Sequence, residues 1–298
     1  MTRLLSLALA TALLGQPALG VAQDARTAEA TAHAAARPPT SGYPHLSLRK
    51  ELAASAVGVG FLTWAALSIS EAPPVPTGGF DPDGIRWGAD RDVIGNVDVH
   101  ANDLSDWTQR MALGFPLAVM FFTADPDARW SEIGARSVVY TQTMATSLGL
   151  TLVGKNLWGR ARPFAYLPLE ERPNEPAYDV TRSRAFRSVP SGHSSSTWTA
   201  VSLAMTEHLM LRPDADAWER LGLGFVGGAL AGATGALRVT AGQHFPSDVL
   251  AGAGLGVSTG VVLPLIHRGS TPMPPPRAWL EMFGAALGGA LVGAWAGS

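Results

Sequence analysis

Two histidines in the second half of the chain have neighbours that suit nucleophilic and acid–base chemistry. The first, His244, lies in the stretch RVTAGQHFPSD at residues 238–248, four residues before Asp248. At that spacing the carboxylate can accept a hydrogen bond from one ring nitrogen, which leaves the other nitrogen free as a nucleophile. Arg238 adds a guanidinium that can bind an anionic group. Alone, a His-to-Asp spacing of four is common and favours a structural role.

The second histidine, His193, follows a short sequence that suits the start of a helix. Residues 190–193 read PSGH and come directly before a long apolar run. The Ser191 hydroxyl can cap that helix, and its first free backbone N–H groups then point outward together, where they can bind an anion. Gly192 lets the backbone approach the anion closely, and His193 is placed to donate a proton to a leaving oxygen. A helix cap with a surface histidine is the structural alternative.

Cationic side chains mark a third stretch, KNLWGRARP at residues 155–163. Lys155 and Arg162 are seven residues apart, so two helical turns place both on one face of a helix, and Pro163 then ends that helix. Two cations on one face can clamp a phosphate, and an arginine can bind two of its oxygens at once. Basic residues just beyond an apolar run are also common anchors at a membrane surface.

Together, the three stretches resemble the motifs of one family. The order Lys-x6-Arg-Pro, Pro-Ser-Gly-His and Arg-x5-His-x3-Asp is similar to the signature of the type 2 phosphatidic acid phosphatase and vanadium haloperoxidase superfamily, and of its phosphatase branch in particular. The resemblance covers about residues 110–267. One position departs from the pattern, because Leu237 precedes Arg238 where the family usually has serine. The site therefore lacks a hydroxyl that relatives usually have there.

The resemblance implies a role for each matching residue. His244 would attack phosphorus to form a phosphohistidine, Asp248 would orient it, and His193 would protonate the leaving alkoxide. The residues that would bind the phosphoryl oxygens and stabilise the transition state are Lys155, Arg162, Ser191, Gly192 and Arg238. The resemblance also implies chemistry without a divalent metal, and we expect no cofactor, because cationic side chains take the place of a metal.

Apolar runs alternate with polar loops and predict the scaffold. The runs cover residues 52–70, 111–124, 135–154, 194–211, 221–237, 248–267 and 278–297. Most approach the ~20 residues that cross a bilayer. We therefore expect an all-α bundle with about six membrane-spanning helices and the active site at helix ends. The run at 111–124 is the weakest span, because it is short and contains Pro116.

Glycines repeat at every fourth position in the last three runs. They are Gly224, Gly228 and Gly232, then Gly252, Gly256 and Gly260, and then Gly284 and Gly288. Such spacing lets helix backbones approach closely, as membrane helices do. A soluble helical core rich in Gly and Ala is the alternative, although glycine destabilises a helix in water by up to ~1 kcal/mol per residue.

The first fifty residues have a different composition. Arg3, the apolar stretch 4–14 and the small residues before Gln23 predict a signal peptide or signal anchor at 1–22. Residues 23–50 are expected to form a disordered linker, and residues 51–298 the helical phosphatase domain, with its motif-bearing core at 110–267. Residues 71–109, rich in Pro, Gly and Asp, are interpreted as a solvated connecting loop rather than a lid over the site.

Basic residues near the ends of the runs predict a topology. They fall on alternate loops, as Arg49 with Lys50, Arg129 with Arg136, Arg212 with Arg220, and Arg268 with Arg277. By the positive-inside rule these loops face the cytoplasm, and the motif-bearing ends face the periplasm. A cleaved signal peptide would invert this arrangement, so the two predictions conflict. We expect a bacterial-type cell envelope location, in the inner membrane with a periplasm-facing site or alternatively in the periplasm.

The composition excludes several classes of binding partner and site. Of the 298 residues 47% are apolar and 15% charged, below the roughly 25% charged residues of soluble domains. The net charge of −2 predicts no nucleic-acid partner, and the absence of cysteine excludes disulfides and thiolate metal sites. We expect a lipid phosphate such as phosphatidate or an isoprenyl diphosphate as substrate, with membrane lipid around the protein. The alternatives are a vanadium-dependent haloperoxidase, a soluble periplasmic acid phosphatase and a non-catalytic lipid-binding protein.

Overall fold

Helices make up the scaffold that carries the three motifs. The computed structural model describes residues 43–69 and 80–298, and in this part the chain forms α-helices and short 3-10 turns without a strand. The α-helices are α2 (Leu48–Leu67), α3 (Gly88–Arg91), α4 (Val99–Thr123), α5 (Arg129–Trp158), α6 (Gly192–Leu211), α7 (Ala217–Thr240), α8 (Pro246–Ile266) and α9 (Pro276–Gly297). The all-α prediction is confirmed, and the expected signal segment at 1–22 lies outside the described residues.

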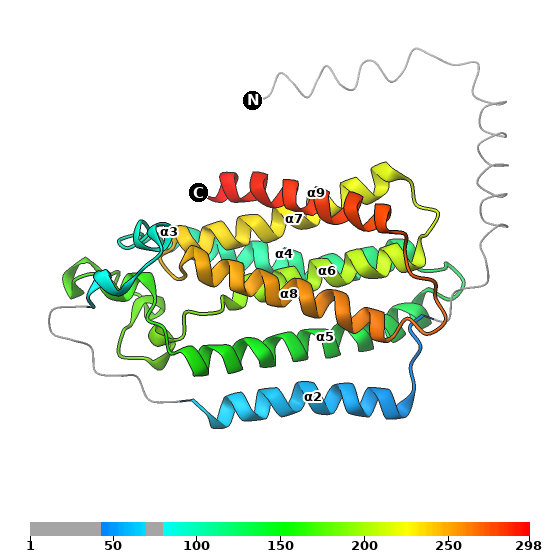
Figure 1. Ribbon diagram of the computed structural model, residues 1–298, viewed down its shortest axis with the longest axis horizontal. Helices are drawn as coiled ribbons and strands as arrows, with labels where there is room; N and C mark the ends of the chain where they lie inside the picture. The colour runs from blue at the N-terminus through cyan, green and yellow to red at the C-terminus, as the bar shows by residue number, and fades with distance from the viewer. Residues whose placement is uncertain (1–42, 70–79) are drawn as a thin grey trace, which may run out of the picture. The chain divides into compact units, whose positions relative to one another are not determined.

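Each predicted apolar run falls largely within one long helix, and successive long helices run in opposite directions (Figure 1). The most extensive packing is between α7 and α9, between α6 and α8, and between α2 and α5, while α4 packs on both α6 and α7. Between α5 and α6 the chain forms four 3-10 turns, Pro163–Tyr166, Leu169–Glu171, Pro176–Tyr178 and Ser183–Phe186. The bundle therefore gathers alternate helix termini at each of its two ends.

Glycines determine the closest helix contacts. On α7, a Cβ at Gly224, Gly228 or Gly232 would overlap the backbone of α9. On α8, a Cβ at Gly252 would lie 2.5 Å from the Ser191 carbonyl oxygen, and one at Gly260 would lie 2.6 Å from the Thr199 carbonyl oxygen of α6. The prediction of close backbone approach is confirmed for these two helices.

The glycine repeat expected on α9 lies on the wrong face. A Cβ added at Gly284 or Gly288 would meet no atom within 4 Å. Gly289 and Gly293 face α7 instead, and a Cβ at either would overlap the α7 backbone. The prediction from spacing alone was wrong here because α9 carries two interleaved sets of glycines, and only packing decides which set faces a neighbour.

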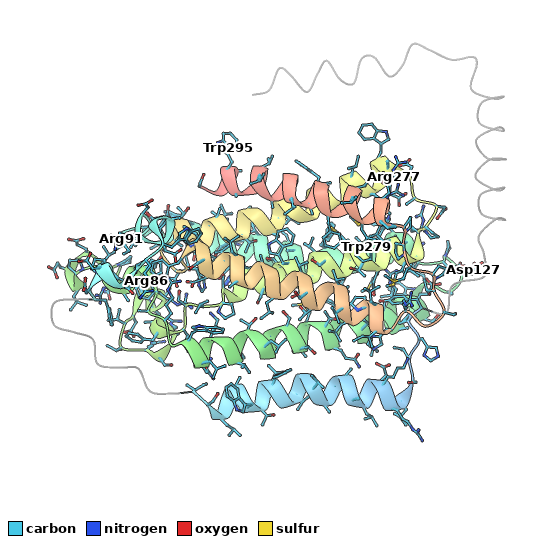
Figure 2. All side chains as sticks on the ribbon, in the orientation of Figure 1. Arg86, Arg91, Asp127, Arg277, Trp279 and Trp295 are labelled. Carbon is cyan, nitrogen blue, oxygen red and sulfur yellow. The ribbon has the colours of Figure 1, made fainter. Side chains whose placement is uncertain are left out.

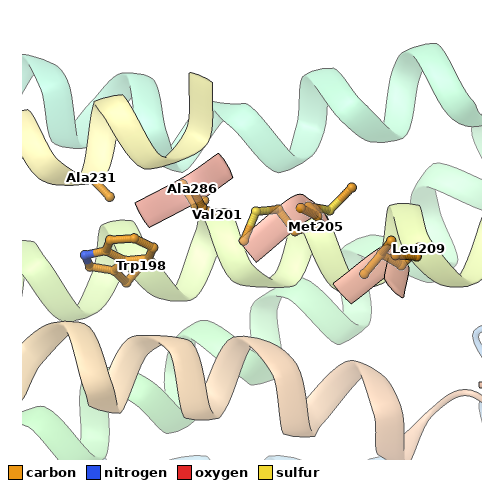
Figure 3. Packing of buried hydrophobic residues seen from close by; sticks show 8 residues of the cluster. Trp198, Val201, Met205, Leu209, Ala231 and Ala286 are labelled. Atoms are coloured by element: carbon orange, nitrogen blue, oxygen red, sulfur yellow. The ribbon is translucent and has the colours of Figure 1, made fainter. Parts of the chain in front are cut away.

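Helix α6 lies at the centre of the bundle and is buried along most of its length. Trp198, Val201, Met205 and Leu209 of α6 form an apolar cluster with residues of α7 and α9 that include Ala231 and Ala286 (Figure 3). On the side facing α5, buried hydroxyl pairs join the helices, and Thr151 Oγ1 lies 2.7 Å from Ser195 Oγ. Paired hydroxyls satisfy polar groups that would otherwise be costly to bury.

Three helices, α7, α8 and α9, are long and apolar enough to cross a membrane. The expected number of about six spans is not confirmed, because only these three meet that condition among the described residues. The central helix α6 illustrates the reason, since its length suffices but serine and threonine dilute its apolar character. Large apolar side chains of α9 point outward, including Leu291 and Trp295, the latter 81% exposed (Figure 2).

The basic residues of the predicted topology gather at one end of the bundle, and the motifs gather at the other. Of the basic residues used for that prediction, Arg277 is labelled in Figure 2 and lies at the first end, as does Asp127. Arg86 and Arg91, which were not used for it, mark the motif end (Figure 2). Arg136 is an exception, because it is buried within α5 and its Nε donates to Glu207 Oε2 at 3.0 Å. It is an internal ion-pair partner rather than a loop charge.

Two segments differ from the expected loop and linker boundaries. Tyr43 donates a hydrogen bond of 2.7 Å to buried Glu207, and α2 begins at Leu48, so the helical region begins before residue 51. Residues 99–109, expected within a connecting loop, are the first turns of α4, where Asp98 caps the helix by accepting from the Ala101 N–H. A polar composition concealed this helix start, because a capped helix end needs few apolar residues.

Candidate active site

The three motifs meet at one end of the bundle. The carboxyl ends of α5 and α7 lie there beside the amino ends of α6 and α8, at the left of Figure 1. Direct contacts join them: the Ser191 N–H donates to the Asp248 carbonyl oxygen at 2.9 Å, and Arg162 Nη1 donates to Gln243 Oε1 at 2.7 Å. Residues separated by 57 and 81 positions in sequence therefore share one small region.

Lys155 and Arg162 do not lie on one helix face, contrary to the expectation from their spacing. Helix α5 ends at Trp158, where Gly159 adopts a left-handed conformation with φ of 56°, which glycine adopts without steric cost. The helix thus ends five residues before Pro163. Lys155 lies in the last turn of α5, and its Nζ donates to the carbonyl oxygens of Arg187 and Ser188 at 2.7 and 3.3 Å.

Two of the three guanidinium nitrogens of Arg162, Nε and Nη1, donate hydrogen bonds to protein oxygens. Nε donates to the Arg184 carbonyl oxygen at 2.9 Å, and Nη1 donates to Gln243 Oε1 and to the Gln243 carbonyl oxygen at 2.7 and 3.1 Å. Burial and the neighbouring Arg238 lower the pKa of the Arg162 guanidinium to about 9. At neutral pH it remains a cation whose orientation is fixed.

Arg238 lies in the last turn of α7 and is anchored by α4. Its Nη1 donates to Asn102 Oδ1 at 2.7 Å and to Ser105 Oγ at 3.1 Å, while Nε is buried without a hydrogen-bond acceptor in the described part of the chain. A buried donor without a partner is costly, so this edge of the guanidinium suits a bound anion. The preceding Leu237, which replaces the usual serine, packs with Ala101 and Ala241 in an apolar cluster.

The start of α6 faces the same region. Ser191 is the N-cap, and its hydroxyl accepts from the Ser194 N–H at 3.4 Å. The nearest atom to a Cβ built on Gly192 would be Lys155 Cε at 3.7 Å, so the backbone at this glycine approaches the lysine side chain. A helix start beside a cation is a favourable place for an anion.

His193 pairs with a carboxylate that does not belong to the motifs. Its Nε2 lies 2.7 Å from Asp106 Oδ1 on α4. Burial and the nearby Arg238 lower the pKa of His193 to about 3, although Asp106 acts in the opposite direction. The imidazole is therefore neutral at neutral pH in the absence of a bound anion.

His244 lies in the turn between α7 and α8 and is almost fully buried. Gly242 makes this turn possible, since its φ is 65° and a Cβ there would overlap the Asn96 carbonyl oxygen. Burial, followed by the charges of Arg162 and Lys155, holds the pKa of His244 well below its usual range. The ring is therefore neutral and keeps the lone pair that a nucleophile requires.

Asp248 is fully buried in the first turn of α8. Its Oδ2 accepts from the Phe245 N–H at 2.9 Å and from Ser188 Oγ at 2.5 Å, and lies 3.7 Å from His244 Nδ1. This last separation is within ion-pair range but longer than a hydrogen bond, and His244 Nδ1 has no other partner among the described residues. Oδ1 accepts from Arg160 Nη1 at 2.8 Å.

Comparison with known families identifies this helix group. Residues 136–272 match the PAP2 superfamily. Over this range the chain is similar to that superfamily. No curated protein and no solved structure matched the chain. The family resemblance expected from the three motifs is confirmed, and the match suggests phosphatase or related phosphoryl-transfer activity.

The PAP2-superfamily match contains all three motifs and runs from α5 to the residues after α8. Helices α2, α3, α4 and α9 lie outside it. No group of three or more His, Cys, Asp or Glu side chains that could hold a metal ion occurs in residues 43–69 and 80–298. The side chains gathered at the motif end include the guanidinium groups of Arg162 and Arg238 and two neutral imidazoles, which suit a phosphoryl group.

Sequence reasoning missed several residues that shape the PAP2 site. Arg160 could have been found, because it lies within the stretch that supplied Lys155 and Arg162. Asp90 and Asp106 gave no signal, since they come from segments interpreted as a solvated loop. Their side chains reach the site only through the packing of α3 on α8 and of α4 on α6.

Proposed function

We propose that the chain is a metal-independent phosphatase that hydrolyses a phosphate monoester or diphosphate through a phosphohistidine on His244. The main support is the environment of His244, a buried neutral imidazole among Lys155, Arg162 and Arg238. The unpartnered Nε of Arg238 adds to it, because a phosphoryl group would supply the missing acceptor. Cations that bind developing negative charge contribute a large part of such catalysis.

The residues account for each step of the reaction. With Nδ1 toward Asp248, His244 Nε2 attacks phosphorus, so a P–N bond forms while the bond to the leaving oxygen breaks. Neutral His193 first takes the proton that the phosphate monoanion carries and donates it to that oxygen, so its imidazole is neutral again and becomes the base for the second step. There it takes a proton from water, whose oxygen attacks phosphorus while the P–N bond breaks. That proton leaves with the released phosphate, which returns the site to its starting protonation.

The substrate we favour is a lipid phosphate such as phosphatidate or an isoprenyl diphosphate. Three helices long and apolar enough to cross a membrane support this choice, because α7 and α8 carry site residues at their ends. An acyl or prenyl chain could stay in the bilayer while its head group reaches His244. The motif end would then face the periplasm.

Phosphate release should occur in the presence of EDTA. The test uses purified full-length protein in detergent with phosphatidate, an isoprenyl diphosphate and a short-chain alkyl phosphate, each with and without EDTA. We expect EDTA to leave every rate unchanged, and the two lipids to have the higher kcat/KM. Activity that EDTA abolishes and a divalent metal restores would contradict the proposed chemistry.

At low pH, kcat/KM should fall because a group of the enzyme, His244, becomes protonated; we call this fall the acidic limb. His244 must be unprotonated to attack, and its pKa lies below the usual value of 6.5 because of burial and neighbouring cations. Activity is therefore present above that lowered pKa and is lost as the pH falls through it. We expect kcat/KM to persist below pH 6.5, and an acidic limb centred above that value would contradict the assignment.

The fall of kcat/KM at higher pH, the basic limb, should instead be determined by the second pKa of the substrate's phosphate group. Since the pKa of His193 is about 3, the proton for the leaving group must arrive with the substrate, and a phosphate monoester keeps that proton only below its second pKa of about 6. We expect kcat/KM to fall above about pH 6, and to fall at lower pH for an ester with a lower second pKa. A limb at the same pH for both esters would argue against this proton route.

The protein should remain with membranes after an alkaline carbonate wash. Helices inserted in the bilayer resist such a wash, because their apolar surfaces would otherwise face water. Immunoblots of the washed pellet and supernatant provide the measurement. Recovery in the supernatant would favour the soluble periplasmic alternative.

A further inference from the structure

Arg160 joins two carboxylates from different parts of the chain. Its Nη1 donates to Asp248 Oδ1 at 2.8 Å, and its Nη2 donates to Asp90 Oδ2 at 2.8 Å. The guanidinium lies over the Phe245 ring, 4.0 Å from the ring centroid. Asp90 also accepts from the Ser247 N–H at 3.0 Å. Two carboxylates and one aromatic ring therefore fix the position of this guanidinium.

The two carboxylates that bind Arg160 are shielded from water. Asp90 is 3% exposed and Asp248 is fully buried. Burial opposes the charge of Arg160, but the hydrogen bond to Asp90 and the attraction of Asp248 outweigh it and raise the pKa of Arg160. Charge-assisted hydrogen bonds of this kind are stronger than neutral ones and fix geometry.

The three groups together leave one net negative charge beside His244. If Asp90 were absent, Arg160 would neutralise Asp248, which would then stabilise less positive charge on the imidazole ring. Because Arg160 occupies Oδ1 of Asp248, the other oxygen is the one that faces His244 Nδ1 at 3.7 Å. Orientation and charge of Asp248 are thus controlled through a single guanidinium.

We propose that Arg160 and Asp90 are positioning residues of the active site. Arg160 orients Asp248 toward His244, and Asp90 balances the charge of Arg160, so that Asp248 stays effective. This inference rests on the proposed phosphohistidine chemistry. It also gives α3, which precedes the family match, a part in catalysis through Asp90.

The test compares full-length variants with an alkyl phosphate as substrate. They are Asp90→Asn, Arg160→Gln, the double variant, and Asp92→Asn as the matched control, since Asp92 is exposed and undergoes the same chemical change. We expect each of the first two to lower kcat by about 10- to 100-fold with KM nearly unchanged, and the control to keep wild-type kcat. Since Asp90 acts through Arg160, the double variant should lose no more than Arg160→Gln alone.

Two further readouts separate positioning from damage to the fold. Inhibition by inorganic phosphate should be unchanged in Asp90→Asn, and the acidic limb of its kcat/KM profile should move to lower pH, because the removed negative charge had favoured protonated His244. Arg160→Lys, which keeps the charge, should recover part of the kcat.

Several results would overturn the positioning role. They are wild-type kcat in Asp90→Asn or Arg160→Gln, additive losses in the double variant, weaker phosphate inhibition together with the lower kcat, or no recovery in Arg160→Lys. The proposed function fails separately, if wild-type protein gives no phosphohistidine on incubation with a radiolabelled substrate.

Discussion

His244→Ala should reduce phosphate release by about 10⁴- to 10⁶-fold, which is the loss expected when a nucleophile is removed. The other imidazole of the site, His193, is paired with Asp106 at 2.7 Å and lies on α6, so it is not positioned to replace the buried ring. The measurement is release of inorganic phosphate from an alkyl phosphate under single-turnover conditions. Acid quenching of the same reaction should trap a labelled phosphohistidine in wild-type protein and none in the variant.

The control for this variant is His100→Ala, because His100 is an exposed histidine at the start of α4. It should leave both the rate and the label unchanged. Substantial turnover in His244→Ala would show that another group attacks phosphorus, and a label that persists in that variant would place the covalent intermediate elsewhere.

Arg238→Lys should lower kcat by about 10²- to 10³-fold, as when one donor to a developing oxyanion is lost. Lysine keeps the positive charge but has no planar fork, so it cannot bind two phosphoryl oxygens while also contacting Asn102 and Ser105 as Arg238 Nη1 does. The measurement is kcat/KM together with inhibition by vanadate, which resembles the transition state. Both should weaken by a similar factor.

Arg86→Lys provides the matched control, since Arg86 is exposed and lies at the same end of the bundle (Figure 2). It should behave as wild type. If Arg238→Lys keeps full activity, charge alone is sufficient at this position and the bidentate contact is not required.

The sequence predicted the long helices well, and it singled out the three motif stretches that the structure brings to one end of the bundle, because both leave local signals. Apolar runs located the long helices, and residue types such as His244 with Asp248 indicated the chemistry. It failed where geometry depends on a single backbone conformation. Gly159 ends α5 early, so Lys155 and Arg162 reach the same end of the bundle through a turn and not through helical periodicity.

The electrostatic setting of the site could not be predicted from the motifs. Asp106 and Asp90 lie in polar segments without periodicity, and their partners are 87 and 70 residues away in sequence. Contacts of this kind depend on which helix faces pack together, and a single sequence carries little information about that. The expected number of about six membrane spans is not confirmed for a related reason, since a buried helix such as α6 can resemble a span in length while polar residues line it.

The glycine-mediated contact between α6 and α8 has a consequence for turnover. A Cβ at Gly252 would lie 2.5 Å from the Ser191 carbonyl oxygen, and the Ser191 N–H donates to the Asp248 carbonyl oxygen, so the two helix starts are in direct backbone contact. We therefore expect the fluctuations that admit substrate or release phosphate to come from α4, whose side chains Asn102 and Asp106 contact Arg238 and His193. Substitutions along α4 can then change how fast product leaves without altering the speed of bond cleavage.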